Sequence, residues 1–363
     1  MVNGINLALQ FLDSFAFIVL AAAGLAIIFG IMGVINLAHG EFILIGAYTT
    51  TLAVTQLGLP LDVAMVVGGL VTGLFGIITE RVVISGAVPN WLWQFTQPRL
   101  SGGLRRVATV GDSATAKLRA VPLPGSNSLR EGLDSVTTGL RSMADGLPSG
   151  PIIEPLYDRL ADSMVATFGL SLMLTQGARI VFGNSIDQIS TPFGALSYGT
   201  FSYSWYRIVL AVVSIGLLVA TYYLFTRTEF GMRARATIQD KDTAQALGVN
   251  TERMYMLTFG IGSALAGLTG ALFAPVISMQ PTLGDQFLVE AFVAVVVGGP
   301  SVVLGTALSG GVLGAILAAF TNLYGTFAGR IALLVAALIA LRFLPEGITG
   351  FIEQIQKRRQ ESE

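Results

Sequence analysis

The 363-residue sequence contains no cysteine and only one histidine. Disulfides, thiolate metal sites and cysteine nucleophiles are therefore excluded, and a single histidine cannot form a histidine-rich metal site. The sequence also lacks the Gly-x-x-x-x-Gly-Lys-Ser/Thr loop that binds nucleotide phosphates. We therefore predict a protein that is not an enzyme, needs no cofactor or metal, and does not bind ATP in the standard way.

Charge is also scarce: 12% of the residues are charged and 53% are hydrophobic, whereas ordinary soluble domains carry about a quarter charged residues. The formal net charge of −1 argues against nucleic-acid binding. No Lys or Arg precedes Arg81, so the first apolar run lacks the basic start of a signal peptide and is expected to remain as a span. These features predict a multi-pass protein of the cell (plasma or inner) membrane.

Nine apolar segments organise the chain, and several reach the roughly 20 residues that a spanning helix needs. They are Phe11–Ile35, Phe42–Leu57, Val63–Val83, Met164–Phe182, Ile208–Phe225, Met256–Met279, Phe287–Val297, Val302–Leu323 and Ile331–Leu344. The seventh is too short to span and is interpreted as a half-helix that ends at Gly298-Gly299-Pro300; broken helices are tolerated where they are buried or line a cavity. The predicted fold is all-α and polytopic, with about eight transmembrane helices and one half-helix.

Small residues recur four positions apart within these segments, as in Gly262, Ala266 and Gly270. In lipid no hydrophobic force brings helices together, and such spacing lets their backbones approach closely. We therefore expect tight helix contacts around the segment Met256–Met279.

Lys and Arg gather in three places, namely Arg81–Arg159, Arg227–Arg253 and Arg342–Arg359, while the connections near 58–62, 184–205 and 280–286 have none. Basic loops are enriched on the cytoplasmic side. Alternation through nine segments puts all three basic regions on one side, so the N-terminus is expected outside and the C-terminus in the cytoplasm. The exceptions, Arg179, Arg207 and Arg330, lie near the outer ends of spans.

Two stretches of similar pattern suggest a parallel internal repeat, as in some transporters. A span runs into Asn36–Gly40 before the next helix opens, and Phe292–Val297 runs into Gly298–Ser301 in the same way. The predicted parts are an N-terminal transmembrane repeat of three spans (1–84), a cytoplasmic insert (85–155), two central spans (156–226), a cytoplasmic loop (227–255), a C-terminal transmembrane repeat (256–347) and a cytoplasmic tail (348–363).

The insert contains one predicted amphipathic helix, whose apolar residues alternate at spacings of four and three. They are Leu129, Leu133, Val136, Leu140, Met143 and Leu147. Such a helix would lie on the membrane surface or on the protein's own cytoplasmic face; the alternative is a docking element for another subunit.

A polar notch lies between the first two apolar segments and contains Asn36, His39 and Glu41. Polar groups at the end of a span are costly unless they face a cavity or a partner. His39 would either hydrogen-bond a substrate or pair with a carbonyl and so join two helices. Asn36 is expected to satisfy backbone groups, and Glu41 to cap the following helix, because a carboxylate favours a helix N-terminus.

Three residues of the predicted half-helix are further candidates for the translocation pathway. Glu290 lies near the start of the half-helix. It would be either a simple N-terminal charge or, if it lies deeper in the membrane, a group that couples transport to protons. Gly298 and Gly299 permit a tight break; the alternative is that their amides face the pathway. Asp13, near the outer end of the first span, is expected to be solvated.

The loop 227–255 favours a short helix from Ile238 to Leu247, with Ala244 and Leu247 on one face beside Asp240. Gly248 is a natural helix stop. A short, charged and exposed helix suits a permease that receives force from a cytoplasmic ATPase; the alternative is an ordinary amphipathic connector.

Five motifs resemble the membrane subunits of branched-chain amino acid ABC transporters, including the urea and amide type. They are Gly33-Val-Ile-Asn36-Leu-Ala-His39-Gly40-Glu41-Phe42, Arg227-Thr-x-x-Gly231-x-x-x-Arg235-Ala236 with Ala246-Leu247-Gly248-Val249, Leu257-Thr-Phe259-Gly-x-Gly-x-x-Leu-Ala266-Gly267, Ala291-Phe292-Val-x-Val-Val-Val-Gly298-Gly299, and Arg342-x-x-Pro345-x-Gly347. The sequence departs from the family pattern at Pro300, at Asp240 and in its long insert.

The resemblance implies a permease subunit of an ABC importer that forms half of a pathway for branched-chain amino acids or for urea and short-chain amides. Its implied partners are a second related permease, two cytoplasmic ATPase subunits, an extracellular solute-binding protein and membrane lipid. The implied ATPase-coupling residues are Arg235, Asp240, Lys241, Ala244, Leu247, Gly248 and Val249. The rival interpretation is an ion-coupled secondary transporter or channel that works without an ATPase, with Glu290 or Glu41 carrying the coupling.

Overall fold

The computed structural model describes residues 2–86, 105–110, 112–113, 116, 134–138, 141, 156–157, 159–198 and 201–360. The chain forms two compact units, of which the larger comprises Met1–Glu80 and Leu156–Glu363 and the smaller Arg81–Pro155. Most of the predicted amphipathic helix in the insert lies outside the described residues; of its stretch, 134–138 is helical.

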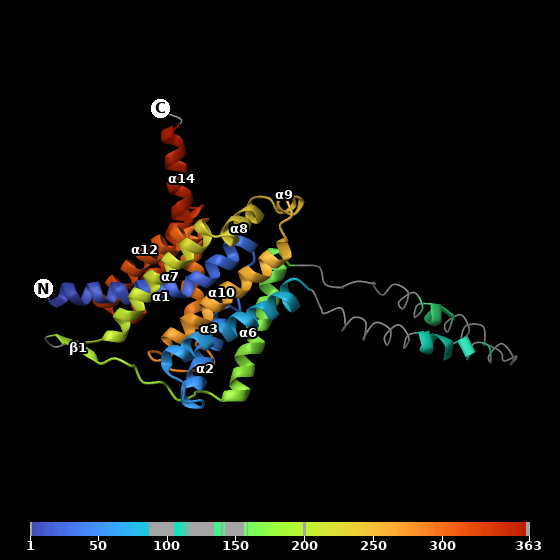
Figure 1. Ribbon diagram of the computed structural model, residues 1–363, viewed down its shortest axis with the longest axis horizontal. Coiled ribbons are helices and arrows are strands. Elements are labelled where there is room, and N and C mark those ends of the chain that lie inside the picture. Colours follow the sequence, from blue (N-terminus) through green and yellow to red (C-terminus); the bar gives the residue numbers. More distant parts are fainter. Residues whose placement is uncertain are drawn as a thin grey trace. The chain divides into compact units, whose positions relative to one another are not determined.

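The larger unit is a bundle of helices with one short hairpin (Figure 1). Its helices are α1 (Val2–Met32), α2 (His39–Thr55), α3 (Leu61–Thr79), α6 (Leu160–Phe182), α7 (Trp205–Arg227), α8 (Glu229–Gln239), α9 (Lys241–Ala246), α10 (Thr251–Phe273), α11 (Asp285–Gly298), α12 (Val302–Tyr324), α13 (Thr326–Phe343) and α14 (Gly347–Gln360). A π-helical turn, Glu80–Ile84, follows α3. Strands β1 (Ala195–Tyr198) and β2 (Phe201–Ser204) pair antiparallel. The predicted all-α class is confirmed.

Seven helical stretches among the described residues are long and apolar enough to cross a membrane. They are Gly4–Met32, Leu61–Ile84, Leu160–Phe182, Trp205–Arg227, Thr251–Phe273, Val302–Tyr324 and Thr326–Arg358. Helix α11 has only 14 residues and ends at Gly298, as predicted for the half-helix. Helix α2 is also short, with 17 residues; at 1.5 Å per residue it covers about 25 Å, less than the roughly 30 Å of a hydrocarbon core. Among the described helices that match the nine predicted apolar segments, α2 and α11 are therefore both short, where one short helix was expected.

Helices α1 and α10 form the interior, whereas α6 and α13 are mostly exposed to the surroundings of the bundle. Glycines make the interior contacts possible. A Cβ atom on Gly24 would collide with the carbonyl oxygen of Gly262, and one on Gly270 with the carbonyl oxygen of Ile43. The close packing expected from the small residues of α10 is thus confirmed.

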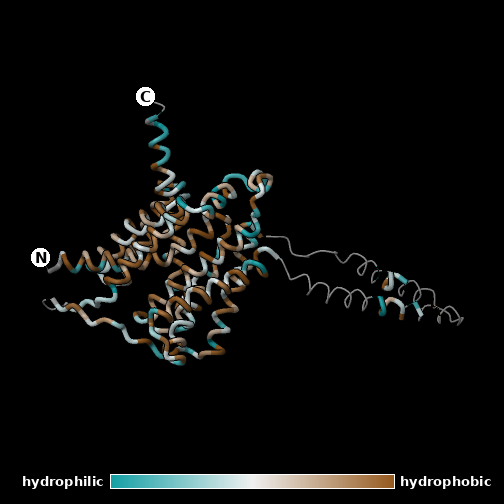
Figure 2. The backbone as a smooth tube through the Cα atoms, viewed as in Figure 1, coloured by the Kyte–Doolittle hydropathy of each residue, from teal (hydrophilic) through white to brown (hydrophobic). Residues whose placement is uncertain are grey.

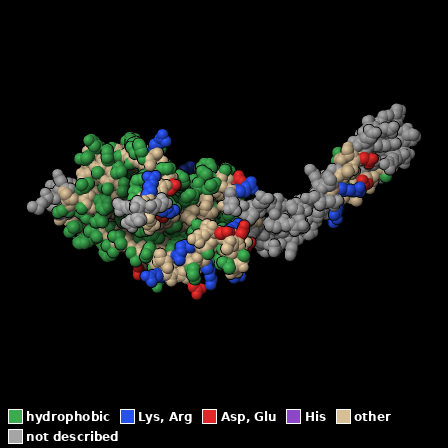
Figure 3. All heavy atoms as spheres, turned by 90° about the horizontal axis from the view of Figure 1, so that it is seen from above, with side chains coloured by type: hydrophobic (Ala, Val, Ile, Leu, Met, Phe, Trp, Pro, Cys, Tyr) green, Lys and Arg blue, Asp and Glu red, His purple; other side chains and the backbone are tan. Residues whose placement is uncertain are grey.

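The two ends of the bundle differ in character. Helices α8, α9 and α14 lie at one end and the β1–β2 hairpin at the other (Figure 1). The long helices are mainly hydrophobic, whereas the end of α14 is hydrophilic (Figure 2). Seen from the α14 side, hydrophobic side chains cover the left part of the bundle, and charged side chains are scattered over its middle, right and lower edge (Figure 3).

Candidate functional site

The polar notch is a helix junction held by hydrogen bonds. The Oδ1 atom of Asn36 accepts from the backbone N–H of Ala38 at 3.0 Å, which forms an Asx turn before α2. The Nε2 atom of His39 lies 2.9 Å from the carbonyl oxygen of Ala21 in α1. Both side chains are buried. Of the two roles considered for His39, the geometry is that of a tie between helices.

Glu41 joins α2 to the peripheral helix α6. Its Oε1 atom accepts from the hydroxyls of Ser171, at 2.8 Å, and Thr175, at 3.1 Å. Within the described residues, no side chain makes a capping hydrogen bond to α2. Glu41 lies in the first turn, where its charge suits the helix dipole, but the hydrogen bonds expected from a cap go to α6 instead.

The break after α11 packs against the beginning of α14. Gly299 adopts φ 86°, a conformation that favours glycine. The hydroxyl of Thr349 donates to the carbonyl oxygen of Gly298 at 2.8 Å, and a Cβ on Gly299 would lie only 2.5 Å from the carbonyl oxygen of Glu346. This geometry is that of a tight break with close contact, the first of the two roles considered for Gly298 and Gly299.

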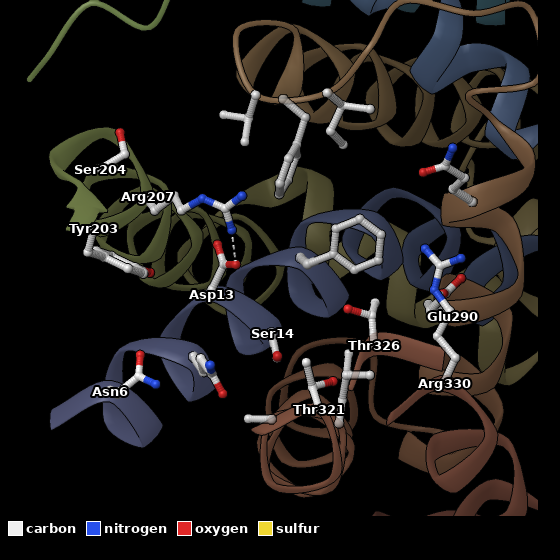
Figure 4. Close-up of a pocket in the computed structure, with 18 of the residues that line it drawn as sticks. Asn6, Asp13, Ser14, Tyr203, Ser204, Arg207, Glu290, Thr321, Thr326 and Arg330 are labelled. Atoms are coloured by element: carbon white, nitrogen blue, oxygen red, sulfur yellow. Dashed lines mark hydrogen bonds and ion pairs between the residues drawn. The ribbon is translucent and has the colours of Figure 1, made fainter. Parts of the chain in front are cut away.

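A cavity of about 640 Å³ opens in the bundle near the β hairpin. Its walls come from α1, β2, α7, the end of α10 and the segment after it, α11, α12 and α13 (Figure 4). Glu290 is the only predicted pathway residue among its lining residues. Phe17, Phe273, Val276 and Ile277 supply apolar surface, and Asn6, Ser14, Thr321 and Thr326 supply polar groups.

Two carboxylate–guanidinium pairs face this cavity. The Arg207 guanidinium donates a hydrogen bond to the Asp13 carboxylate, which joins α7 to α1. Glu290 Oε1 lies 3.7 Å from Arg330 Nε, between α11 and α13. Asp13 is thus paired, not simply solvated as expected. Both arginines were predicted near the outer ends of spans, but no local sequence signal indicates which carboxylate each one meets.

The loop between α7 and α10 contains two helices where a single one, Ile238–Leu247, was predicted. Asp240 has φ −159° and ends α8. Its Oδ1 atom accepts from the backbone N–H groups of Asp242 and Thr243, each at 3.0 Å. The hydrogen bonds from the Thr243 backbone and hydroxyl hold the pKa of Asp240 below its ordinary value. The cap therefore starts a new helix, α9.

The end of α9 agrees with the predicted glycine stop. Gly248 has φ 87°, and its N–H donates to the carbonyl of Gln245 at 2.9 Å. The N–H of Val249 donates to the carbonyl of Ala244 at 3.0 Å, which completes a Schellman motif. Leu247 is left 78% exposed, while Ala244 is buried. A large apolar side chain thus stands on a rigidly capped turn.

Two cations connect this loop to the bundle. Lys241 Nζ lies 5.9 Å and 5.8 Å from the ring centroids of Tyr157 and Tyr255, distances typical of cation–π contacts. The Tyr157 hydroxyl donates to the carboxylate of Glu80, just after α3. Arg235 donates to the carbonyl oxygen of Phe225, near the end of α7. Of the predicted coupling residues, Arg235 and Lys241 therefore face the bundle and Leu247 faces away from it.

The chain matches one known protein family over most of its length. The model of the family described as "Branched-chain amino acid transport system / permease component" matches residues 7–89 and 152–344. The interval between the two matches falls within the predicted insert.

Individual relatives cover most of the chain. This chain is 26% identical over 357 residues to the high-affinity branched-chain amino acid transport system permease protein LivH of Escherichia coli. The match covers 96% of this chain and 94% of the relative. The chain is 24% identical over 346 residues to BraD of Pseudomonas aeruginosa, covering 91% of each. A probable LivH of Methanocaldococcus jannaschii is 28% identical over 221 residues, which is 56% of this chain and 70% of the relative. No solved structure matches.

Proposed function

Because this chain belongs to the family of branched-chain amino acid transport permeases, we propose that it forms half of the translocation pathway of an ABC importer. Its partners are a second related permease, two cytoplasmic ATPase subunits and an extracellular solute-binding protein. The solute is a branched-chain amino acid or, alternatively, urea or a short-chain amide. ATP binding and hydrolysis in the partners drive alternating access in this subunit.

The observation that carries this proposal is the form of α9. It is a single short helix, fixed at its start by Asp240 and at its end by Gly248, and it presents Leu247 outward. An exposed apolar side chain on a short helix is suited to insertion into a groove of a partner protein. We therefore assign Asp240–Val249 to the ATPase contact.

The contacts behind α9 supply a route for its movement. Lys241 rests on Tyr255, in the first turns of α10, and on Tyr157, which precedes α6. The two rings lie 4.4 Å apart, centroid to centroid. The Tyr157 hydroxyl is hydrogen-bonded to the carboxylate of Glu80, just after α3. Since α10 packs against α1, α2 and α3, a displacement of α9 is passed to the interior of the bundle.

The distribution of basic residues supports the orientation of the subunit. Arg227, Arg233 and Arg235 flank or lie in α8, and Lys357 lies in α14, at the same end of the bundle (Figure 1). Basic segments favour the cytoplasmic side. The cavity near the hairpin then opens outward, towards a solute-binding protein, with the N-terminus outside and the C-terminus inside.

The substitution Leu247→Asp tests the coupling assignment. It places a charge where the ATPase contact requires an apolar group, so co-purification of the ATPase subunits is expected to fall at least roughly tenfold, the effect of about 1.4 kcal/mol. Leu247→Met preserves the apolar side chain and is the matched control, expected to co-purify normally. Membrane insertion of both variants should be unchanged, because Leu247 makes no contribution to the core. Normal ATPase recovery with Leu247→Asp would remove Asp240–Val249 as the contact.

A further inference from the structure

The two ion pairs of the outward cavity differ in tightness. Asp13 and Arg207 are hydrogen-bonded, whereas Glu290 Oε1 and Arg330 Nε are 3.7 Å apart. Charge-assisted N–H···O bonds are usually about 2.7–2.9 Å long. The Glu290 side chain is 9% exposed, while that of Arg330 is 50% exposed. The nearly buried Glu290 carboxylate therefore lies too far from Arg330 for a tight hydrogen bond. Each of the two groups can still form a shorter bond with another charged group.

The surroundings of this loose pair suit a small ligand with an apolar part. Phe17 and Phe273 line the same cavity and pack edge-to-face, with ring centroids 5.5 Å apart. Val276 and Ile277 add aliphatic surface. A volume of about 640 Å³ lies within the usual range of small-molecule sites. Figure 4 shows Glu290 and Arg330 side by side, and Asp13 with Arg207 at another part of the wall.

We propose that Glu290 and Arg330 form an exchangeable ion pair that receives the head group of a zwitterionic amino acid. The ligand's ammonium binds the Glu290 carboxylate, its carboxylate binds the Arg330 guanidinium, and its apolar side chain lies against the aromatic and aliphatic wall. Asp13 and Arg207 remain paired and hold α1 to α7. This inference rests on the proposed function and selects the amino acid over urea or an amide.

The physical reason for that selection is charge. A nearly buried carboxylate is costly unless it is paired and hydrogen-bonded. A zwitterion that separates Glu290 from Arg330 gives each group a new counter-ion. Urea and simple amides are neutral, so they would separate the pair without replacing either charge.

The absence of cysteine from the chain allows a direct test on the assembled importer. In Thr326→Cys, the new thiol lies in the cavity lining and is the only one in this subunit. Its rate of modification by a polar methanethiosulfonate reagent is measured without ATP and without the binding protein. The probes are L-leucine, 4-methylpentanoate (without the ammonium), 3-methylbutylamine (without the carboxylate), urea and acetamide.

L-Leucine is expected to slow the modification, and the other four probes to do so at least roughly tenfold more weakly, the loss expected with a charge-assisted contact. Adding Glu290→Gln or Arg330→Gln should raise the leucine concentration needed for protection by a similar factor. Arg330→Lys keeps a positive charge and should recover part of the protection by leucine that Arg330→Gln loses. The matched control is Asp13→Asn, which neutralises the other carboxylate of the cavity and should change protection by less than about twofold. The rate without any probe reports whether each variant retains an accessible cavity.

Equal protection by urea or acetamide would overturn the inference, as would unchanged protection in Glu290→Gln or an equal loss in Asp13→Asn. Its failure is distinguishable from failure of the proposed function. If the importer takes up leucine with ATP but leucine does not protect the thiol introduced by Thr326→Cys, the exchangeable pair is wrong and the importer assignment stands.

Discussion

His39 and Ala21 join the beginning of α2 to the middle of α1, with 2.9 Å between the imidazole Nε2 atom and the carbonyl oxygen. The preceding carbonyl, that of Leu20, accepts a hydrogen bond from the Thr269 hydroxyl of α10 at 2.8 Å. A carbonyl oxygen has two lone pairs, so each can accept a side-chain bond in addition to its helical one. Two consecutive residues of α1 thus anchor two neighbouring helices.

His39→Ala should therefore lower stability more than it impairs transport. Loss of the hydrogen bond and of a fully buried ring is expected to cost about 2–5 kcal/mol, as for other large-to-small changes in a core. The measurement is thermal unfolding in detergent together with uptake per folded molecule. A variant that unfolds at the wild-type temperature yet has lost uptake would instead make His39 a substrate contact.

Glu41 should tolerate an amide but not truncation. The amide oxygen of Glu41→Gln can still accept from Ser171 and Thr175, so stability and uptake should remain near those of the wild type. Glu41→Ala leaves both hydroxyls of α6 without this acceptor and is expected to cost about 1–3 kcal/mol in unfolding free energy. Abolished uptake in Glu41→Gln, with normal folding, would favour ion coupling through this carboxylate.

Gly270→Ala should disrupt the contact between α10 and α2. The new methyl group would collide with the carbonyl oxygen of Ile43 and lie 2.8 Å from the backbone nitrogen of Ala47, and backbone cannot move aside as a flexible side chain can. We expect a loss of at least about 1–3 kcal/mol, typical of overpacking. In the matched control, Gly311→Ala, the added methyl meets no described atom within 4 Å. Its unfolding temperature in detergent should not fall; equal losses in both variants would contradict this packing.

Asp240 should control the order of α9 through its ionised cap. Hydrogen bonds from Thr243 and Asp242 hold the pKa of Asp240 below its ordinary value. A lowered folded-state pKa gives stability that is present above the unfolded value and is lost as the pH falls through the folded one. Acid should therefore raise amide hydrogen exchange in 241–248, after correction for intrinsic rates.

The cap substitutions separate charge from hydrogen bonding. Asn is a good N-cap and does not titrate, so Asp240→Asn should keep α9 protected and remove the acid step. Asp240→Ala should increase exchange in α9 at neutral pH. Equal protection in Asp240→Ala and the wild type would show that the cap does not determine the order of this helix.

Much of the fold follows from local sequence signals. The apolar runs predict the long helices, Gly248 predicts the end of α9, and the glycines at 298 and 299 predict the break after α11. Each of these features depends on residues within one or two turns of the chain. The division of the predicted helix Ile238–Leu247 was missed because the carboxylate of Asp240 competes with helix continuation by capping the following turn.

The polar contacts between helices could not be predicted in the same way. Arg207 and Asp13 are 194 positions apart, and Glu41 meets its hydroxyl partners 130 and 134 positions later. Which of these groups meet depends on how α1, α6 and α7 are rotated and packed. A single sequence indicates which helix faces are apolar but not which faces meet.

Uptake of radiolabelled leucine into proteoliposomes is the most direct test of a passive permease driven by partner ATPases. Vesicles containing both permeases and the ATPases, with ATP inside (the ATPase side) and the binding protein outside, should accumulate leucine. Vesicles containing this chain alone, under a proton or sodium gradient, should not. Accumulation by the isolated chain under such a gradient would contradict the ATPase-driven mechanism.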